Sequence, residues 1–230
     1  ASTVGSSVVA NNNIIANNPI VSIAHYGGSA IDANCNWWGQ ATGPLSGQNS
    51  GNVTAGTYLN SGTDNQPGTP GFQPANGTCI GPVHNINQNT YYTKIQDAVN
   101  AANANDVIEA ADGTYNERVT IDKSLTLQGQ SETGVILDGT GLSGTGSGFK
   151  INSNVTNVTI QTMTIQNYTG SSPNGSAGIY ANGSNDGFTA DHVTVKNNVS
   201  ASGIYANGPV DGFEVTNSTV SGHGPGARGI

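Results

Sequence analysis

Two aspartates in matching surroundings are the residues best placed to do chemistry in this 230-residue chain. Asp186 and Asp211 are each followed by Gly and Phe, which suggests that they occupy equivalent positions of a repeat. If the chain repeats its shape between them, the two carboxylates stack, and stacked oxygen ligands attract a divalent cation such as Ca²⁺. An Asp-Gly pair is also a common turn, and the chain has neither an acidic 12-residue loop nor a GGxGxD repeat. We therefore expect turn residues here, with Ca²⁺ as the weaker alternative, and no cofactor.

A basic residue facing an acidic pair would be one indication of a catalytic site. The chain has two arginines. Arg118 is expected to pack or to pair locally with Glu117, and Arg228 lies in a glycine-rich turn. Four histidines stand outside any nucleophile motif such as GxSxG: His25, His84, His192 and His223. We therefore predict no catalytic residue.

The composition excludes several classes of protein. Only 9% of the residues are charged, the formal net charge is -8, and none of the six Lys and Arg residues precedes Lys94. Such a chain cannot neutralise many phosphates, so nucleic acid and anionic membranes are not expected partners. No run of about 18 apolar residues is present to insert in a membrane. The Asn/Thr-rich composition, with 30 asparagines, favours a secreted protein, and Ala1 at the start is compatible with removal of a leader.

The last third of the chain is repetitive. The run Gly178–Gly183 recurs as Gly203–Gly208, at an offset of 25. One turn earlier the offset is 30, with Val158 matching Phe188, and the difference fits a loop insertion at Ser171–Gly175. A period of this length, with short alternating segments and Gly/Asn turns, predicts an all-β, right-handed parallel β-helix.

In such a solenoid the apolar members of each alternation point inward and stack as ladders. The residues expected in these ladders are Val158, Ile160, Ile165, Ile179, Phe188 and Val195.

The preceding segment predicts the start of the solenoid. A capping-box pattern at Thr93 and Gln96, followed by apolar residues at helical spacing, predicts one short amphipathic helix over Lys94–Ala104. A helix laid on the first coil would cover the free edge of a solenoid, which otherwise invites aggregation. Three β-like segments follow it: Val107–Ala110, Val119–Ile121 and Ser124–Leu127.

The first part of the chain predicts the opposite end of a β-helix. Val8–Ile15 aligns with Ile31–Trp38 at an offset of 23, which gives two further coils. We expect Trp37 and Trp38 to plug the final coil, with a sugar-stacking platform as the alternative.

These segments give four regions: residues 1–43 as C-terminal coils, 44–82 as a Gly/Pro/Ser/Thr-rich linker, 83–147 as the cap helix and first coils, and 148–230 as continuing coils. The order suggests a permuted unit of a tandem array. Joining Ile230 to Ala1 would place Ile15 within one residue of the position that Val220 predicts.

Several motifs resemble known families. The run Asn34–Gly39, followed by Thr42–Pro44, resembles the closing motif of right-handed parallel β-helix repeats in large bacterial and archaeal surface proteins. Four other runs are similar to the opening of the pectin-lyase-like superfamily: Lys94–Val99, Asn105–Ile108, Gly113–Glu117 and Leu125–Gly129. The resemblance implies the fold but not one activity, because the superfamily includes lyases, esterases, epimerases, phage tailspikes and adhesins.

Cysteines, tyrosines and asparagines complete the candidate sites. Cys35 and Cys79 are either two thiols or one disulfide, and the secreted character of the chain favours the disulfide. Tyr180 and Tyr205 stack if the repeat holds, and we expect packing rather than sugar binding. Nine Asn-X-Ser/Thr sequons are candidate glycosylation sites: Asn52, Asn76, Asn154, Asn157, Asn167, Asn174, Asn182, Asn198 and Asn217.

We expect a non-catalytic structural or adhesive module of an extracellular or cell-surface fibre that associates with itself end to end. Surface polysaccharide is the second expected partner. The alternatives are a fragment of a lyase-like or esterase-like carbohydrate-active enzyme, and a glycan-binding module.

Overall fold

The structure is a computed structural model that describes residues 10–11, 13–16, 22–74, 79–170, 177–224 and 229–230. The chain divides into two compact units, which are described separately. The first unit comprises residues 1–82 and 90–93, and the second comprises residues 83–89 and 94–230. The described ranges are nearly all β, with a single helix, and contain no helix long and apolar enough to cross a membrane.

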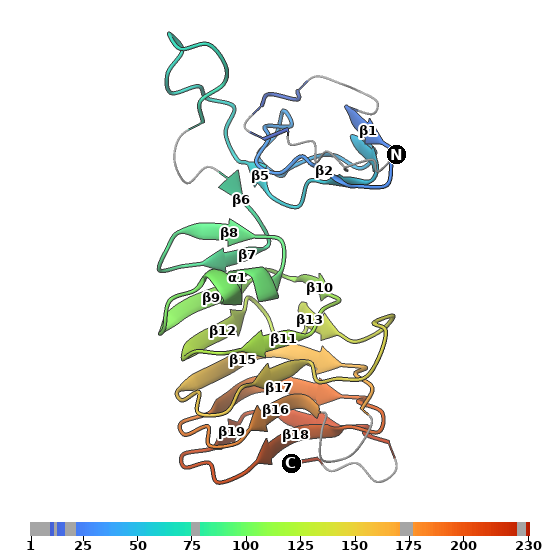
Figure 1. The fold of residues 1–230 in the computed structure, drawn as a ribbon, viewed down its shortest axis with the longest axis vertical. Coiled ribbons are helices and arrows are strands. Elements are labelled where there is room, and N and C mark those ends of the chain that lie inside the picture. The colour runs from blue at the N-terminus through green and yellow to red at the C-terminus, as the bar shows by residue number, and fades with distance from the viewer. Residues whose placement is uncertain (1–9, 12, 17–21, 75–78, 171–176, 225–228) are drawn as a thin grey trace, which may run out of the picture. The chain divides into compact units, whose positions relative to one another are not determined.

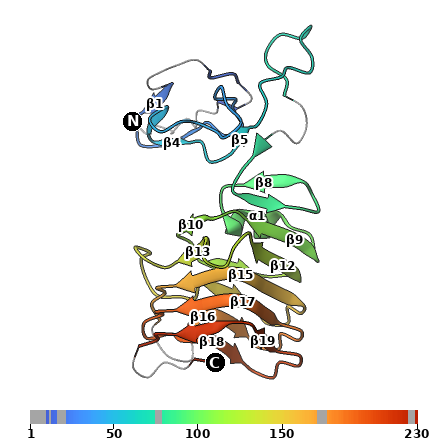
Figure 2. The ribbon, with the colours of Figure 1, turned by 180° about the vertical axis from the view of Figure 1, so that it is seen from behind.

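The second unit is a stack of coils that contribute parallel strands to three faces, here named faces 1, 2 and 3 (Figures 1 and 2). Face 1 contains β9 (Asp106–Ala110), β12 (Leu125–Gly129), the first half of β15 (Val158–Gln166), the first half of β17 (Thr189–Lys196) and β19 (Glu214–Thr216). Face 2 contains β10 (Gly113–Tyr115), β13 (Val135–Asp138), the second halves of β15 and β17, and β20 (Thr219–Ser221). Face 3 contains β11 (Val119–Ile121), β14 (Phe149–Ile151), β16 (Ala177–Asn182) and β18 (Ser202–Asn207). Because the chain visits the three faces in turn, the unit is a parallel β-helix, as the sequence predicted.

The strand register confirms the offsets in this unit. Tyr180 pairs with Tyr205 and Val195 with Val220, the offset of 25. Ile165 pairs with Val195, the offset of 30. The loop insertion expected at Ser171–Gly175 lies outside the described residues.

The core consists of inward side chains stacked from coil to coil, because alternate residues of a strand point to opposite sides. Every described position in these columns before the last coil is buried. The face 1 column is Ile108, Leu127, Ile160, Ala190 and Val215. The face 2 column is Tyr115, Leu137, Ile165, Val195 and Val220. The face 3 column is Val119, Phe149, Ile179 and Ile204.

One end of the second unit is capped. On face 1, β7 (Val83–Asn85) pairs antiparallel with β9 and so ends the parallel stack. On face 3, α1 (Ile95–Ala101) lies against β11, and buries Ile95, Ala98 and Val99. Figures 1 and 2 show α1 at the end of the stack that is opposite to β18 and β19. The cap helix was therefore predicted in the right place, but it is shorter than Lys94–Ala104.

The first unit contains smaller coils. Ile14 bridges to Trp37, as the offset of 23 predicted, and Ile15 N donates to Trp37 O at 2.6 Å. A further coil follows, because β1 (Ile23–His25) pairs with β3 (Asn49–Gly51) and β2 (Ile31–Asp32) pairs with β4 (Val53–Thr54), both parallel. The remaining strands are β5 (Tyr58–Leu59), β6 (Cys79–Ile80) and β8 (Thr90–Tyr92).

The structure corrects the boundary of the expected linker. Residues 49–59, which were assigned to the linker 44–82, form a third coil, in which Tyr58 bridges to Asn36 beside the tryptophans. The tryptophans therefore do not close the final coil, although Trp38 is a buried core residue at 2% exposure. The coil was missed because its strands are only two or three residues long and are rich in Gly, Asn, Ser and Thr, which give little alternation.

Candidate functional site

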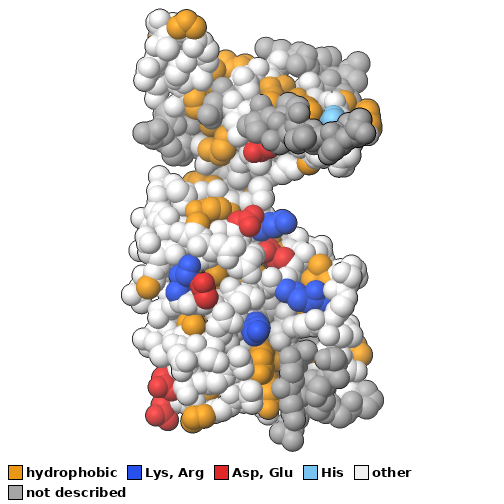
Figure 3. Space-filling model, in the orientation of Figure 1, with side chains coloured by type: hydrophobic (Ala, Val, Ile, Leu, Met, Phe, Trp, Pro, Cys, Tyr) orange, Lys and Arg blue, Asp and Glu red, His pale blue; other side chains and the backbone are white. Residues whose placement is uncertain are grey.

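The two candidate aspartates lie in successive coils, where they take part in hydrogen bonds that join one coil to the next. Asp186 Oδ1 accepts a hydrogen bond from Asp211 N at 3.0 Å, and Gly187 N donates to Asp211 O at 2.7 Å. Gly187 has a φ of 71°, which an Asp-Gly turn supplies at little cost. Among the described residues, no group of three or more His, Cys, Asp or Glu side chains could hold a metal ion. Figure 3 shows the charged side chains scattered over one face of the molecule rather than gathered in a cluster.

Arg118 does not pair with Glu117. Its Nη1 donates to Ser143 O at 3.1 Å and its Nη2 donates to Gly144 O at 2.8 Å, so it fastens a loop between coils. Of the two expected roles, packing or an ion pair with Glu117, the ion pair is not formed, because the guanidinium binds carbonyl oxygens of the next coil instead. Arg228 lies outside the described residues.

The side chain of Glu117 instead caps α1. Its two carboxylate oxygens accept hydrogen bonds from Ile95 N and Gln96 N, both at 2.9 Å. The predicted capping box at Thr93 and Gln96 is wrong, because the helix begins after Lys94, which makes no side-chain capping bond. A carboxylate is favourable at this end of a helix, where unpaired N–H groups carry partial positive charge.

Lys123 caps the other end of the same helix. Its Nζ donates to three carbonyl oxygens at the end of the helix: Val99 O at 3.1 Å, Ala102 O at 3.2 Å and Asn100 O at 3.3 Å. Because Glu117 and Lys123 flank β11, one strand supplies opposite charges to both ends of the cap helix.

Gln96 completes the cap by substituting for a neighbouring strand. Its Oε1 accepts from Thr120 N at 2.6 Å, and its Nε2 donates to Thr120 O at 3.2 Å. The outer edge of β11 is thus paired with a side-chain amide, and a further strand cannot add to it there.

Replacing Glu117 by alanine is expected to destabilise the second unit by about 2 kcal/mol, because two helix N–H groups lose a charged acceptor. Urea unfolding together with hydrogen exchange at the α1 amides would measure the loss. Glu214→Ala is the matched control, since the Glu214 side chain lies exposed at the other end of the stack. Equal stability of both variants would contradict a capping role.

Asp106 holds the corner between the cap and face 1. The residue is only 6% exposed, and its Oδ2 accepts from Asn85 Nδ2 at 2.8 Å, Gln88 Nε2 at 2.6 Å and Asn103 N at 2.8 Å. The hydrogen bond from Asn85 lowers the pKa of this carboxyl, with smaller contributions from Asn103, Gln88 and the charge of Lys123, against the opposing effect of burial. The folded chain therefore favours the ionised form of Asp106.

This lowered pKa predicts acid sensitivity of the cap. A carboxyl whose folded pKa lies below its unfolded value stabilises the fold above the unfolded pKa, near 4, and the stabilisation is lost as the pH falls through the folded pKa. Asp106→Asn should destabilise the second unit by about 1–3 kcal/mol at pH 7 and by less at pH 3. Urea unfolding at the two pH values would measure this, and an equal loss at both would contradict it.

The outward polar side chains of face 1 bond to one another along the stack. Gln128 Nε2 donates to Glu109 Oε2 at 2.9 Å, and Gln161 Nε2 donates to Gln128 Oε1 at 3.3 Å. In the next two coils, Thr216 Oγ1 donates to Asp191 Oδ1 at 2.7 Å. The hydrogen bond with His192, followed by those from Thr216 and Asn217, lowers the pKa of Asp191 to about 2. The outward polar side chains thus form hydrogen bonds with one another from coil to coil.

Tyr180 and Tyr205 form a similar pair on face 3. Their rings stack with centroids 5.7 Å apart and an interplanar angle of 5°. Asn207 Nδ2 donates to Tyr180 Oη at 3.1 Å, and Tyr180 Oη donates to Asn182 Oδ1 at 3.0 Å. Each ring uses one aromatic face on the other, which leaves less aromatic surface for a sugar ring.

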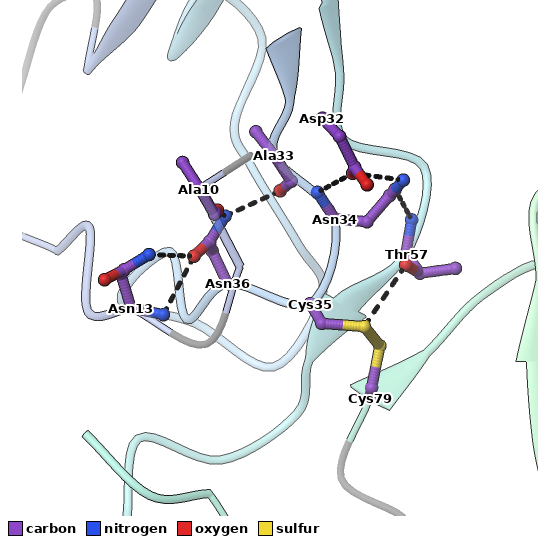
Figure 4. Close-up of a disulfide and its surroundings, with 9 residues drawn as sticks. All are labelled: Ala10, Asn13, Asp32, Ala33, Asn34, Cys35, Asn36, Thr57 and Cys79. Carbon is purple, nitrogen blue, oxygen red and sulfur yellow. Dashed lines mark hydrogen bonds between the residues drawn. A yellow bond between two sulfur atoms is a disulfide. The ribbon is translucent and has the colours of Figure 1, made fainter. Parts of the chain in front are cut away.

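Cys35 and Cys79 form a disulfide in the structure, 44 residues apart in the sequence (Figure 4). It fastens β6 to the coils of the first unit, where Leu59 of β5 pairs antiparallel with Cys79. Next to it, the buried Asn36 accepts hydrogen bonds through Oδ1 from the backbone and side chain of Asn13. The disulfide and the asparagine ladder therefore stabilise successive coils.

The sequons differ in accessibility. Asn52, Asn154, Asn157 and Asn217 are exposed, and Asn167 and Asn182 are half-buried. Asn198 is fully buried, and its Oδ1 accepts from Tyr168 N at 2.9 Å, so it is not available for glycosylation in the folded chain. Asn76 and Asn174 lie outside the described residues.

The two units are capped at opposite ends. In the first unit the antiparallel β6 covers the coil that is last in the sequence, whereas Ile14 on the first coil is 54% exposed. In the second unit the first coil is capped by β7 and α1. In the described ranges, β19 and β20 carry no strand on their outer side. Within the residues that the structure describes, each unit thus has one capped and one open end, and the two open ends are of opposite sense.

The fold defines this chain as a parallel β-helix protein. No family model, no curated protein and no solved structure matches it.

Proposed function

We propose that the chain is a structural or adhesive module of an extracellular or cell-surface fibre, with no catalytic role. The observation that carries the proposal is the hydrogen bonding of outward polar side chains between coils, as in Glu109, Gln128 and Gln161. Groups arranged in this way stiffen a rod and present a hydrated surface with few charges, whereas an active site needs polar groups that converge on a substrate.

Secretion is part of the proposal. The Cys35–Cys79 disulfide supports it, because disulfides persist in oxidising compartments. The resemblance of the Asn34–Gly39 run to repeats of prokaryotic surface proteins supports the same location. Association with further copies of the module is the principal expected interaction, and contact with surface polysaccharide is the second.

Fractionation of native cells tests the proposal. Chymotryptic peptides of this chain should be recovered in the surface or extracellular fraction, in high-mass material, and a peptide that runs from Phe213 through Ile230 into Tyr26 would identify a tandem array. Recovery from the cytosol as a small species would overturn the proposal, as would cleavage of polysaccharide by the purified chain.

A glycan-binding module is the second candidate, and the paired rings of Tyr180 and Tyr205 are the feature that favours it. Binding to a surface polysaccharide that is lost in Tyr205→Ala and kept in Tyr58→Ala would support this candidate over a purely structural role.

A further inference from the structure

We propose that the open edge of the second unit, formed by β19 and β20, binds the open edge of the first unit of another copy of this chain. The inference rests on the proposed structural function, which makes another copy of this chain the partner. It specifies which surfaces meet and in which register.

The first argument is the polarity of the caps. Another coil cannot add in parallel to β9, which is covered by the antiparallel β7, or to β5, which is covered by the antiparallel β6. Among the described residues, the surfaces left for parallel addition are β19 and β20 in the last coil of the second unit and residues 13–16 in the first coil of the first unit. One requires a following coil and the other a preceding coil, so the two surfaces are complementary and neither is self-complementary.

The second argument is the direction of the backbone groups. Asn197 N donates to Ser221 O, so the polar groups of Ser221 point into the stack and those of its neighbour Val220 point out of it. In the first unit, Trp37 N donates to Asn13 O and Ile15 N donates to Trp37 O. The polar groups of Ile14, which lies between Asn13 and Ile15, therefore point to the open side.

These directions restrict the register, because the residue opposite Val220 must be one whose own N–H and C=O point into the first unit, such as Ile15. If Val220 lies opposite Ile15, Val220 N–H donates to Ile14 C=O and Ala16 N–H donates to Val220 C=O. A shift by one residue would place the free groups of one edge against groups already bonded within the other.

The same register matches the side chains. Val220 belongs to the inward face 2 column, and Ile15 occupies the position in its coil that the buried Trp38 occupies in the next. Thr219 and Ile14, the outward neighbours, are both exposed. Inward residues thus meet inward residues, as a continuous β-helix requires, since a slip of one residue would reverse the faces.

The last coil of the second unit already has its own backbone on face 3. Ile204 N donates to Gly229 O at 2.9 Å, so Gly229 lies at the face 3 position of the coil that β19 and β20 begin. The partner's first coil would therefore lie on this coil, with Ile15 on face 2 opposite Val220. Such a contact is heterologous, and unless it closes into a ring it produces an open filament.

The test is sedimentation velocity over a range of concentrations, with lysine placed at each edge of the full chain. Wild type should form a series of oligomers that grows with concentration. Val220→Lys and Ile15→Lys should each weaken association roughly 100-fold or more, because each would bury an unpaired ammonium group. The outward controls Thr219→Lys and Ile14→Lys should associate like wild type.

Mixing the two edge variants separates a lost interface from a lost fold. The Val220→Lys chain keeps an intact first-unit edge, and the Ile15→Lys chain keeps an intact second-unit edge. An equimolar mixture should therefore form a heterodimer and grow no further.

A wild-type chain that remains monomeric would overturn the inference, and the fractionation experiment would still decide the structural function independently. Association of Val220→Lys equal to that of Thr219→Lys would also overturn it, as would a mixture that contains only monomers.

Discussion

The double substitution Cys35→Ser and Cys79→Ser is expected to lower the free energy of unfolding of the first unit by about 4 kcal/mol. The estimate follows from the chain entropy that a cross-link across 44 residues removes from the unfolded state. The loss should be large because the strands that remain in this unit are two or three residues long, and each contributes few hydrogen bonds.

Tryptophan fluorescence provides a selective measurement. The chain has two tryptophans, and Trp37 and Trp38 both lie in the first unit, close in sequence to Cys35. Urea titration followed at the tryptophan emission should show an earlier transition for the variant, and treatment of wild type with a reductant should reproduce it. Hydrogen exchange of β15 and β17 is the internal control and should stay unchanged. An unshifted tryptophan transition would show that the disulfide does not hold this unit together.

The regular features of the fold could be predicted from the sequence, because each is repeated. The three sequence offsets predicted the pairing of Ile14 with Trp37, Tyr180 with Tyr205, and Ile165 with Val195. A repeated spacing averages over many weak preferences, so a short polar strand is recognised by its partner even where its own residues are uninformative.

The contacts that end the stack could not be predicted in this way. Glu117 is 22 residues from the helix N–H group that it caps, and nothing near Ile95 in the sequence indicates a cap from another coil. Asp106 likewise gains its role from the positions of Asn85 and Gln88, which depend on the β7–β9 pairing. The strand β6, which covers the last coil of the first unit, was missed for the same reason, since its place depends on its antiparallel pairing with β5.

The role of the two candidate aspartates could not be predicted from the sequence for a similar reason. Asp186 and Asp211 in sequence fit both a cation site and a pair of turns, and in the structure Asp186 Oδ1 accepts a hydrogen bond from Asp211 N, which joins one turn to the next. A sequence pattern gives the types of neighbouring groups, but hydrogen-bond partners follow from the geometry between coils.

Replacing Phe149 by alanine is expected to cost the second unit about 3–5 kcal/mol, the range for truncating a fully buried phenylalanine. Phe149 is completely buried in the face 3 column, where it pairs with Val119 of β11 and Ile179 of β16. Gly148 beside it has no room for a side chain, because an added Cβ would lie 2.7 Å from Tyr168 Cε2 and 2.8 Å from Ile165 Cγ2. Such close packing restricts the movement of neighbours into the vacated space, so a cavity should remain.

Lys150→Ala is the matched control for this substitution. Lys150 is the next residue on the same strand and points outward, so its truncation should change stability by less than about 0.5 kcal/mol. Urea unfolding followed by hydrogen exchange at β14 and β16 would compare the two. A loss in Phe149→Ala no greater than in Lys150→Ala would mean that the inward column is not the main source of stability. Since the stacked columns are shared by every coil, a large loss of stability in Phe149→Ala should also lower the exchange protection of β11, which pairs with β14, and of β18, which pairs with β16.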